Sequence, residues 1–118
     1  MPDKLSSLSH AVLAFRDERD WEQFHGLKHL IVSLCLEANE ILELTQWKSD
    51  AEVDALPLSL EGREALSDEC ADVLAYLLLI AEKAHIDLDA ALRRKLIKNA
   101  QKYPVEKSNG RRDKYPLL

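Results

Sequence analysis

The sequence predicts an all-α protein of the four-helix bundle type. Apolar residues recur at intervals of three and four positions along four long segments, which is the pattern of helices that bury one face. The 118 residues include only three glycines and four prolines, too few for the many tight turns of an all-β protein. Hydrophobic residues make up 47% and charged residues 31%, a balance typical of a folded globular domain.

The first two predicted helices span residues 5–19 and 27–47, and residues 20–26 connect them. The apolar positions of the first are Leu8, Val12 and Phe15. The second carries a longer apolar stripe, formed by Leu27, Leu30, Ile31, Leu34, Ala38, Ile41 and Leu42. Both sets follow helical spacing, so each predicts one buried helical face.

A polar stretch, residues 48–60, precedes the third predicted helix at residues 61–85. The apolar face of this helix contains Leu66, Cys70, Val73, Leu74, Leu77 and Leu78. Asp87 is a good N-cap for a fourth helix, and Pro104 ends that helix because proline cannot continue the hydrogen-bond ladder. We therefore expect one helical domain over residues 1–104 and a basic tail over residues 105–118.

Charge is distributed unevenly along the chain. Residues 1–92 contain 19 acidic and 7 basic residues, a net charge of −12, whereas residues 93–118 contain 2 acidic and 9 basic residues, a net charge of +7. This is not the chain-wide basic surface of a nucleic-acid-binding protein. An acidic body with a basic arm fits a metal held by one part and phosphate by the other, or an arm that neutralises the body.

Membrane insertion and secretion are not expected. The longest apolar run, from Val73 to Ala81, is too short to cross a bilayer, and the N-terminal residues lack the pattern of a secretory signal. A cytoplasmic location is the natural expectation. Cys35 and Cys70 fall at apolar helical positions without metal-binding spacing, so both are expected to be buried small residues.

Two acidic pairs are the main candidate for chemistry: Glu37-x-x-Glu40 on the second helix and Glu69-x-x-Asp72 on the third. Residues three apart share a helix face, and each pair borders an apolar stripe. If the two stripes face each other, four carboxylates meet and need a cation to relieve their repulsion. Oxygen ligands of this kind suit Mg²⁺ or Mn²⁺. The simpler alternative is that these acids lie on solvated helix faces.

The fourth helix carries polar residues on its apolar side. Lys95 and Asn99 project on or beside the face that Leu92 and Leu96 define, so they either bind substrate phosphates or are satisfied within the protein. Trp21, Trp47 and Tyr76 are either core residues or rings on which a nucleotide base stacks.

Together these stretches resemble one known family, the MazG-like, all-α nucleoside triphosphate pyrophosphohydrolases. The acidic pairs, with 28 residues between Glu40 and Glu69, look like its signature. Two further stretches are similar to the dCTP pyrophosphatase branch: Phe15-Arg-Asp-Glu-Arg-Asp-Trp-Glu-Gln-Phe-His25 and Lys95-x-x-x-Asn99-x-x-x-Tyr103-Pro104. The fuller family motif has one more glutamate, where this sequence has Leu36.

The resemblance implies a MazG-like fold whose core is completed by dimerisation, as a homodimer or homotetramer with sites at subunit interfaces. It implies the metal ligands Glu37, Glu40, Glu69 and Asp72. It implies phosphate contacts from Lys95 and Asn99. It also implies a base pocket that contains Trp21, His25, Trp47 and Tyr76.

The reaction expected on this basis is Mg²⁺-dependent hydrolysis of a nucleoside triphosphate, led by dCTP or a modified relative, to the monophosphate and pyrophosphate. Water would attack the α-phosphorus in line while Glu37 or Glu40 accepts its proton. Arg111 and Arg112 of the tail are candidates for countering charge on the leaving group. The cellular role would be removal of damaged nucleotides or control of the nucleotide pool.

Two other classes fit parts of the sequence. Glu22-x-x-His25 and Glu82-x-x-His85 have the letters of a di-iron carboxylate site, although Glu82 points away from Glu69 and Asp72 on its helix and Glu22 precedes its helix. A non-enzymatic adaptor that dimerises through its apolar stripes would explain the core but not the acidic pairs.

Overall fold

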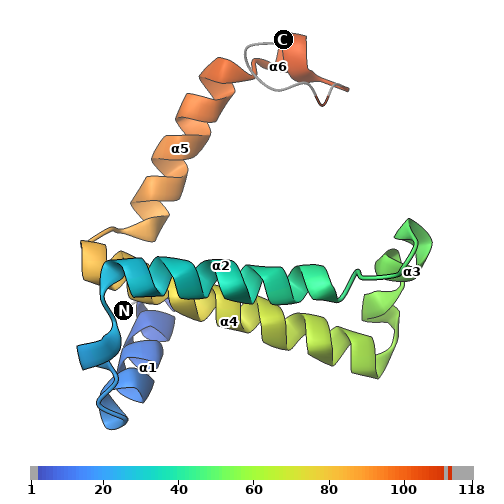
Figure 1. Ribbon diagram of the computed structural model, residues 1–118. Coiled ribbons are helices and arrows are strands. Elements are labelled where there is room, and N and C mark those ends of the chain that lie inside the picture. The colour runs from blue at the N-terminus through green and yellow to red at the C-terminus, as the bar shows by residue number, and fades with distance from the viewer. Residues whose placement is uncertain (1–2, 111, 113–118) are drawn as a thin grey trace. The chain divides into compact units, whose positions relative to one another are not determined.

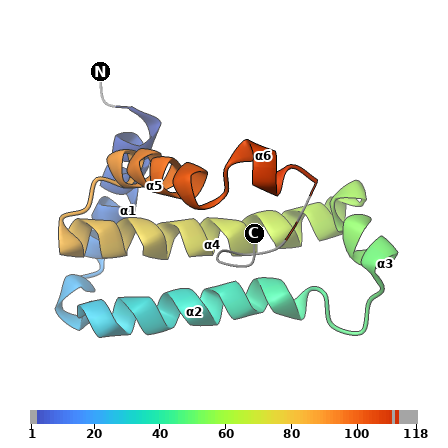
Figure 2. The same cartoon turned by 90° about the horizontal axis from the view of Figure 1, so that it is seen from above.

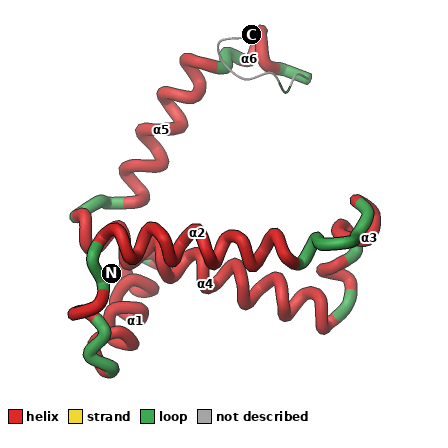
Figure 3. The backbone as a smooth tube through the Cα atoms, in the orientation of Figure 1, coloured by secondary structure: helices red, strands yellow, loops and turns green. Residues whose placement is uncertain are grey.

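The computed structural model describes residues 3–110 and residue 112, and within this part helices are the only regular secondary structure (Figure 3). The all-α prediction is confirmed. The elements in chain order are α1 (Lys4–Glu18), η1 (Glu22–Phe24), α2 (Leu27–Glu43), α3 (Asp50–Asp54), η2 (Leu56–Leu58), α4 (Leu60–Ala84), α5 (Leu88–Lys102) and α6 (Val105–Ser108). The chain divides into two compact units, one through residue 85 and one from residue 86, and each is described by itself.

The first unit is built on an antiparallel pair of helices, α2 and α4. They lie side by side along most of their length, while α1 packs on the C-terminal half of α4 (Figures 1 and 2). The buried apolar residues are Leu30, Leu78, Leu79 and Ala81. Because they lie near the end of the pair where α1 joins, this end holds the tightest packing of the unit.

The connection between α2 and α4 is more ordered than the polar stretch at residues 48–60 predicted. Ser49 caps α3 in a capping box: its hydroxyl accepts from the Glu52 backbone N–H at 3.2 Å, and the Glu52 carboxylate accepts from the Ser49 N–H at 3.0 Å. Ser59 caps α4 by accepting from the backbone N–H of Gly62 at 3.0 Å. Only glycine fits at position 62, because a Cβ there would lie 2.3 Å from the Leu56 carbonyl oxygen.

The second helix ends earlier than expected. The sequence predicts a helix through residue 47, but α2 stops at Glu43 and a turn follows. The Thr45 hydroxyl donates to the Leu42 carbonyl at 2.7 Å, and Trp47 adopts the left-handed conformation with φ 62°. Local hydrogen bonds of this kind compete with the helical ladder, which explains the early end. Trp47 is left 92% exposed.

Large parts of the predicted apolar stripes are not covered within the chain. Leu27, Ile31 and Leu42 of α2 are exposed, and Leu74 and Leu77 of α4 each keep 38% of their surface accessible. The expectation that Cys35 and Cys70 are buried is wrong for this chain by itself, because both are exposed on these faces. The stripes are wider than one helix–helix contact, so a single partner helix buries only part of each.

The second unit contains α5 and α6. Asp87 caps α5 as predicted, since its carboxylate accepts from the Ala90 backbone N–H at 3.2 Å. Pro104 follows the helix and precedes α6, so part of the predicted tail is helical. Arg111 lies outside the described residues, whereas Arg112 is described and exposed. A domain boundary at residue 104 stays a prediction. No helix in the described ranges is both long and apolar enough to span a bilayer.

Candidate metal centre

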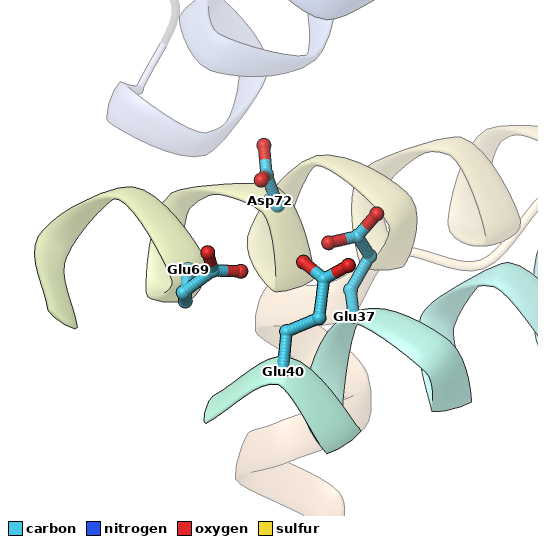
Figure 4. Close-up of side chains that lie close together, drawn as sticks. All are labelled: Glu37, Glu40, Glu69 and Asp72. Carbon is cyan, nitrogen blue, oxygen red and sulfur yellow. The ribbon is translucent and has the colours of Figure 1, made fainter. Parts of the chain in front are cut away.

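Four carboxylates from α2 and α4 converge on one point (Figure 4). Glu37 and Glu40 project from α2 toward α4, where Glu69 and Asp72 meet them. One oxygen from each residue lies within 4.8 Å of one oxygen of every other. This is the convergence that the two acidic pairs predict.

Helical spacing places the acids beside the seam between the two helices. Glu37 comes three residues after Leu34 and four before Ile41, and both of these apolar side chains are partly buried. Glu69 has the same relation to Leu66 and Val73 on α4. Residues three and four apart lie on one helix face, so packing of the apolar neighbours directs the acids toward the facing helix.

The carboxylates of this cluster repel one another in the protein by itself. Burial raises the pKa of Glu37, and the neighbouring carboxylates Glu40 and Asp72 raise it further. The pKa of Glu69 rises to about 7, first because of its side-chain hydrogen bond with Glu40 and then because of burial and the other charges. Two groups that normally ionise near pH 4.5 therefore retain protons above that pH.

Two oxygen atoms of the cluster also lack hydrogen-bond partners. Oε2 of Glu37 and Oε2 of Glu69 are buried and accept no hydrogen bond from any residue that the structure describes. Buried carboxylate oxygens normally have donors, so unsatisfied ones call for a missing partner. The donor set is all oxygen, which suits a hard divalent cation. The residues therefore fit a divalent metal ion.

Comparisons with known proteins agree with this geometry. The model of the MazG-like family matches residues 32–118, a span that includes all four carboxylates. The chain belongs to the MazG-like family. Among its relatives, dCTP pyrophosphatase 1 of Rattus norvegicus is 46% identical and that of Homo sapiens 40% identical, each over 104 residues.

These alignments cover 88% of this MazG-like chain but only 61% of each relative, so the chain spans about three fifths of their length. A solved structure, that of a pyrophosphatase from Archaeoglobus fulgidus, is also similar. It is 37% identical, has a TM-score of 0.78, and the match covers 88% of this chain and 95% of that one. The resemblance inferred from the sequence is confirmed at the level of family and fold.

The residues that the family resemblance assigns to a base pocket have different surroundings. His25 is buried, with 8% of its surface exposed, and its ring stacks on that of His29 at 6.1 Å. Trp21 is 44% exposed and meets the Phe15 ring edge-on at 5.8 Å. Trp47 is largely exposed. Tyr76 is half-buried on α4, one helical turn after Asp72.

Lys95 and Asn99, the predicted phosphate-binding residues, both lie on α5 in the second unit of this MazG-like chain. Lys95 is exposed and Asn99 is half-buried. They are one helical turn apart, so they share a face of α5. Their contact with phosphate stays a prediction.

One buried cation was not singled out from the sequence. Arg16 of α1 is only 8% exposed, and its guanidinium contacts Asp17, Glu22 and Glu82. The signal for it was an arginine four residues after the apolar Val12, on the inner side of the first helix. Glu22 and Glu82 are also the two glutamates that match the di-iron pattern. Their contacts with Arg16 give both an ionic partner within the protein and so favour a structural explanation for that pattern.

Proposed function

We propose that this chain is a divalent-cation-dependent nucleoside triphosphate pyrophosphohydrolase. Its proposed substrate is dCTP or a modified dCTP, and its products are the monophosphate and pyrophosphate. The observation that carries the proposal is the four-carboxylate cluster with two unsatisfied buried oxygens. The names of the relatives support the reaction and the base, because these are a dCTP pyrophosphatase and a pyrophosphatase.

A triphosphate and four carboxylates repel each other, so the proposed site needs a cation. Glu37, Glu40, Glu69 and Asp72 would hold Mg²⁺, or Mn²⁺ as a substitute. When bound, the ion supplies charge neutralisation for the phosphates and lowers the pKa of water. A carboxylate of α2, Glu37 or Glu40, accepts the proton of the attacking water.

The remaining substrate contacts come from two groups of residues. Lys95 and Asn99 bind the phosphates, one through an ammonium and one through an amide. Trp21, His25, Trp47 and Tyr76 are the proposed residues of the base pocket; Trp21 and His25 precede α2 whereas Trp47 follows it, so one chain does not bring all four together. Support comes from His25, whose buried Nδ1 has no hydrogen-bond partner among the described residues and so calls for one.

We further propose that two copies of the chain pair through the exposed faces of α2 and α4. Apolar side chains on these faces include Leu27, Ile31, Leu42, Leu74 and Leu77. Several exposed apolar residues on the faces of two neighbouring helices are typical of an interface between subunits. A homodimer is the smallest assembly that covers it, and two dimers could form a tetramer.

The decisive experiment incubates the protein with a panel of ribo- and deoxynucleoside triphosphates and separates the products by chromatography. We expect monophosphate and pyrophosphate in equal amounts, fastest with a cytosine base, and only when Mg²⁺ or Mn²⁺ is present. Reaction in ¹⁸O-labelled water should place the label in the monophosphate, since the α-phosphorus is attacked. Release of orthophosphate, or no turnover of any nucleotide, would refute the proposal.

A matched pair of variants connects turnover to the cluster. Glu40→Gln removes one charge from the cluster, whereas Glu43→Gln removes a similar charge one turn further along the same helix. Glu43 has the amide of Asn39 at 3.4 Å and lies outside the cluster. We expect loss of turnover for the first variant and wild-type turnover for the second. Equal activity in both would separate the reaction from these carboxylates.

A further inference from the structure

We propose that Arg16 is a positioning residue that holds the segment from Trp21 to His25 in the shape needed to receive the nucleotide base. The inference rests on the proposed function for the base pocket. The contacts of Arg16 with Asp17, Glu22 and Glu82, which we call the clamp, lie within the first unit. The ion pairs of Arg16 are with Asp17, Glu22 and Glu82, which are not members of the carboxylate cluster, so its effect is exerted through the segment it holds.

The guanidinium of Arg16 joins three separate parts of the chain. Its Nε donates to the Asp17 carboxylate at 2.8 Å, within α1. One terminal nitrogen lies 3.5 Å from Glu22 of η1, and the other lies 3.5 Å from Glu82 near the end of α4. Arg16 is the buried residue of α1, with 10% of its side chain exposed. One cation therefore ties α1, η1 and α4 together.

The backbone of Arg16 holds the same segment from the other side. Its carbonyl accepts hydrogen bonds from the backbone N–H of Arg19 at 3.2 Å and of Trp21 at 3.1 Å. Between them, Asp20 takes the left-handed conformation, with φ 53°, which turns the chain back toward α1. Trp21 is thereby brought edge-on against Phe15, one residue before Arg16. The side chain and the main chain of Arg16 thus hold two adjacent residues, Glu22 and Trp21, at the start of the segment.

Arg16 also acts on His25 through its charge. His25 is buried, and its pKa is lowered by that burial first and then by the positive charges of His29, Arg16 and Lys83. A neutral imidazole has one nitrogen that donates and one that accepts, so it can read a polar edge of a base. Burial therefore favours the neutral form of His25, and the Arg16 charge adds to this effect while the Glu22 charge opposes it.

An ionic group at this place is costly, which argues for a directional role. Removing a guanidinium from water carries a large desolvation cost, and an apolar side chain at the same position would have a smaller one. The planar guanidinium, however, contacts three carboxylates in set directions, which an apolar residue cannot do. We therefore attribute the arginine at position 16 to the fixed geometry of its contacts with the three carboxylates.

The kinetic test compares Arg16→Met, Arg16→Lys and Glu82→Gln, with Arg93→Met as a matched control. Arg93 pairs with Asp89 at 2.6 Å on an exposed face of α5, so its removal breaks an ion pair within that helix and leaves the ion pairs of Arg16 intact. For Arg16→Met we expect KM for dCTP to rise about tenfold while kcat stays within about twofold of wild type. Arg16→Lys keeps the charge and should recover part of the loss. Arg93→Met should leave both parameters unchanged.

A double variant tests whether Arg16 and Glu82 act through the same interaction. If both work through the clamp, Arg16→Met with Glu82→Gln should raise KM no more than Arg16→Met by itself. Fully additive effects would overturn the proposal, as would a fall in kcat at constant KM in the single variant.

A spectroscopic test works without any turnover. The chain has two tryptophans, so Trp47→Phe leaves Trp21 as the only indole. In that background we expect Arg16→Met to increase quenching of Trp21 fluorescence by acrylamide, while Arg93→Met leaves it unchanged. Equal quenching in the presence and absence of Arg16 overturns the clamp. Should Arg16→Met fail to fold, Glu82→Gln decides by the same comparison.

The two measurements also separate this inference from the proposed function. If the wild-type chain hydrolyses no nucleotide, the proposed function fails, while the Trp21 quenching still reports whether Arg16 orders the segment. If hydrolysis occurs but Arg16→Met changes neither KM nor quenching, the clamp is overturned and the hydrolase assignment stands.

Discussion

Glu40 on α2 and Glu69 on α4 bring carboxylate oxygens within 4.8 Å of each other across the seam between the two helices, and the pKa of Glu69 rises to about 7. Two carboxyl groups this close repel each other unless one of them keeps a proton. At neutral pH and without metal, the cluster is therefore a set of acids that have not all ionised. This relationship connects metal binding, pH and stability in one site.

Neutralising Glu69 should stabilise the metal-free chain and abolish the increase in stability that Mg²⁺ gives. Glu69→Gln removes one of four converging charges while keeping the shape of the side chain, so repulsion falls. We expect a higher melting temperature than wild type in EDTA, no increase on addition of Mg²⁺, and no turnover. Thermal unfolding followed by circular dichroism, with and without metal, measures the first two.

Glu64→Gln is the control for that experiment, because Glu64 is an exposed acid on the same helix outside the cluster. It should retain both the response to Mg²⁺ and turnover. A metal-free Glu69→Gln protein that is less stable than wild type would contradict the repulsion argument.

The metal-free protein should become less stable as the pH rises from about 4.5 to about 7. The folded chain holds the Glu69 proton up to a pKa of about 7, whereas the unfolded chain releases it near 4.5. In that window the folded state binds more protons, so the free energy of unfolding falls with rising pH and levels off above it. Melting temperatures in EDTA across this range measure the effect.

Saturating Mg²⁺ should reverse this trend, because the metal binds the ionised carboxylates and competes with protons. The reversal should disappear in Glu69→Gln. His25 contributes in the opposite direction, since its lowered pKa makes acidification below about 6.5 destabilising. Comparing wild type with Glu69→Gln cancels that contribution. A metal-free slope that is identical in the two proteins would exclude Glu69 as its source.

Assembly should protect the two cysteines from thiol reagents. Cys35 shares a face of α2 with Ile31 and Leu42, and Cys70 shares a face of α4 with Leu74 and Leu77. All are exposed in the single chain, so burial between two copies would cover them together. We expect slow labelling at concentrations where sedimentation shows a dimer, and faster labelling on dilution.

Denatured protein provides the reference rate for both thiols. If the native dimer labels as fast as the denatured chain at every concentration, then α2 and α4 do not form its interface. A purely monomeric sedimentation profile at high concentration would contradict the proposed pairing directly.

Replacing Trp47 should separate stability from substrate binding. Its backbone is left-handed, with φ 62°, and its side chain is 92% exposed, so the ring contributes little burial to this chain. Asparagine tolerates this conformation better. We expect Trp47→Asn to raise the free energy of unfolding of the monomeric chain by up to about 1 kcal/mol. KM for dCTP should rise about tenfold if the ring stacks on the base.

Leu58→Asn is the matched control, since Leu58 is an apolar residue in the same connection and is 85% exposed. It should leave KM unchanged. A large loss of stability in Trp47→Asn would show that the ring is buried by something other than substrate, such as a second copy of the chain.

Helix identity and the acidic motif followed from local pattern. The spacing of Leu8, Val12 and Phe15 and the capping role of Asp87 predicted α1 and α5 to within a residue or two at their observed ends. The spacing of apolar residues is a property of the amino-acid sequence, so it predicts a helix independently of the tertiary contacts that the helix makes. The same is true of the shared face of Glu37 and Glu40.

Other features were outside the reach of local pattern. The early end of α2 depends on the Thr45 hydroxyl and on the conformation of Trp47, and α3 depends on the reciprocal cap between Ser49 and Glu52. Hydrophobic periodicity does not detect either, because neither involves an apolar stripe. The exposure of Cys35 likewise depends on how much of its face one neighbour covers.

Local pattern is sufficient to show that this protein is helical, that its acids are paired on single helix faces, and that it resembles the MazG-like family. The meeting of the two pairs within 4.8 Å and the contacts of Glu22 and Glu82 with Arg16 become known from the folded chain. Helical spacing fixes directions within one helix but not between helices. Packing between α2, α4 and α1 determines which of those directions meet.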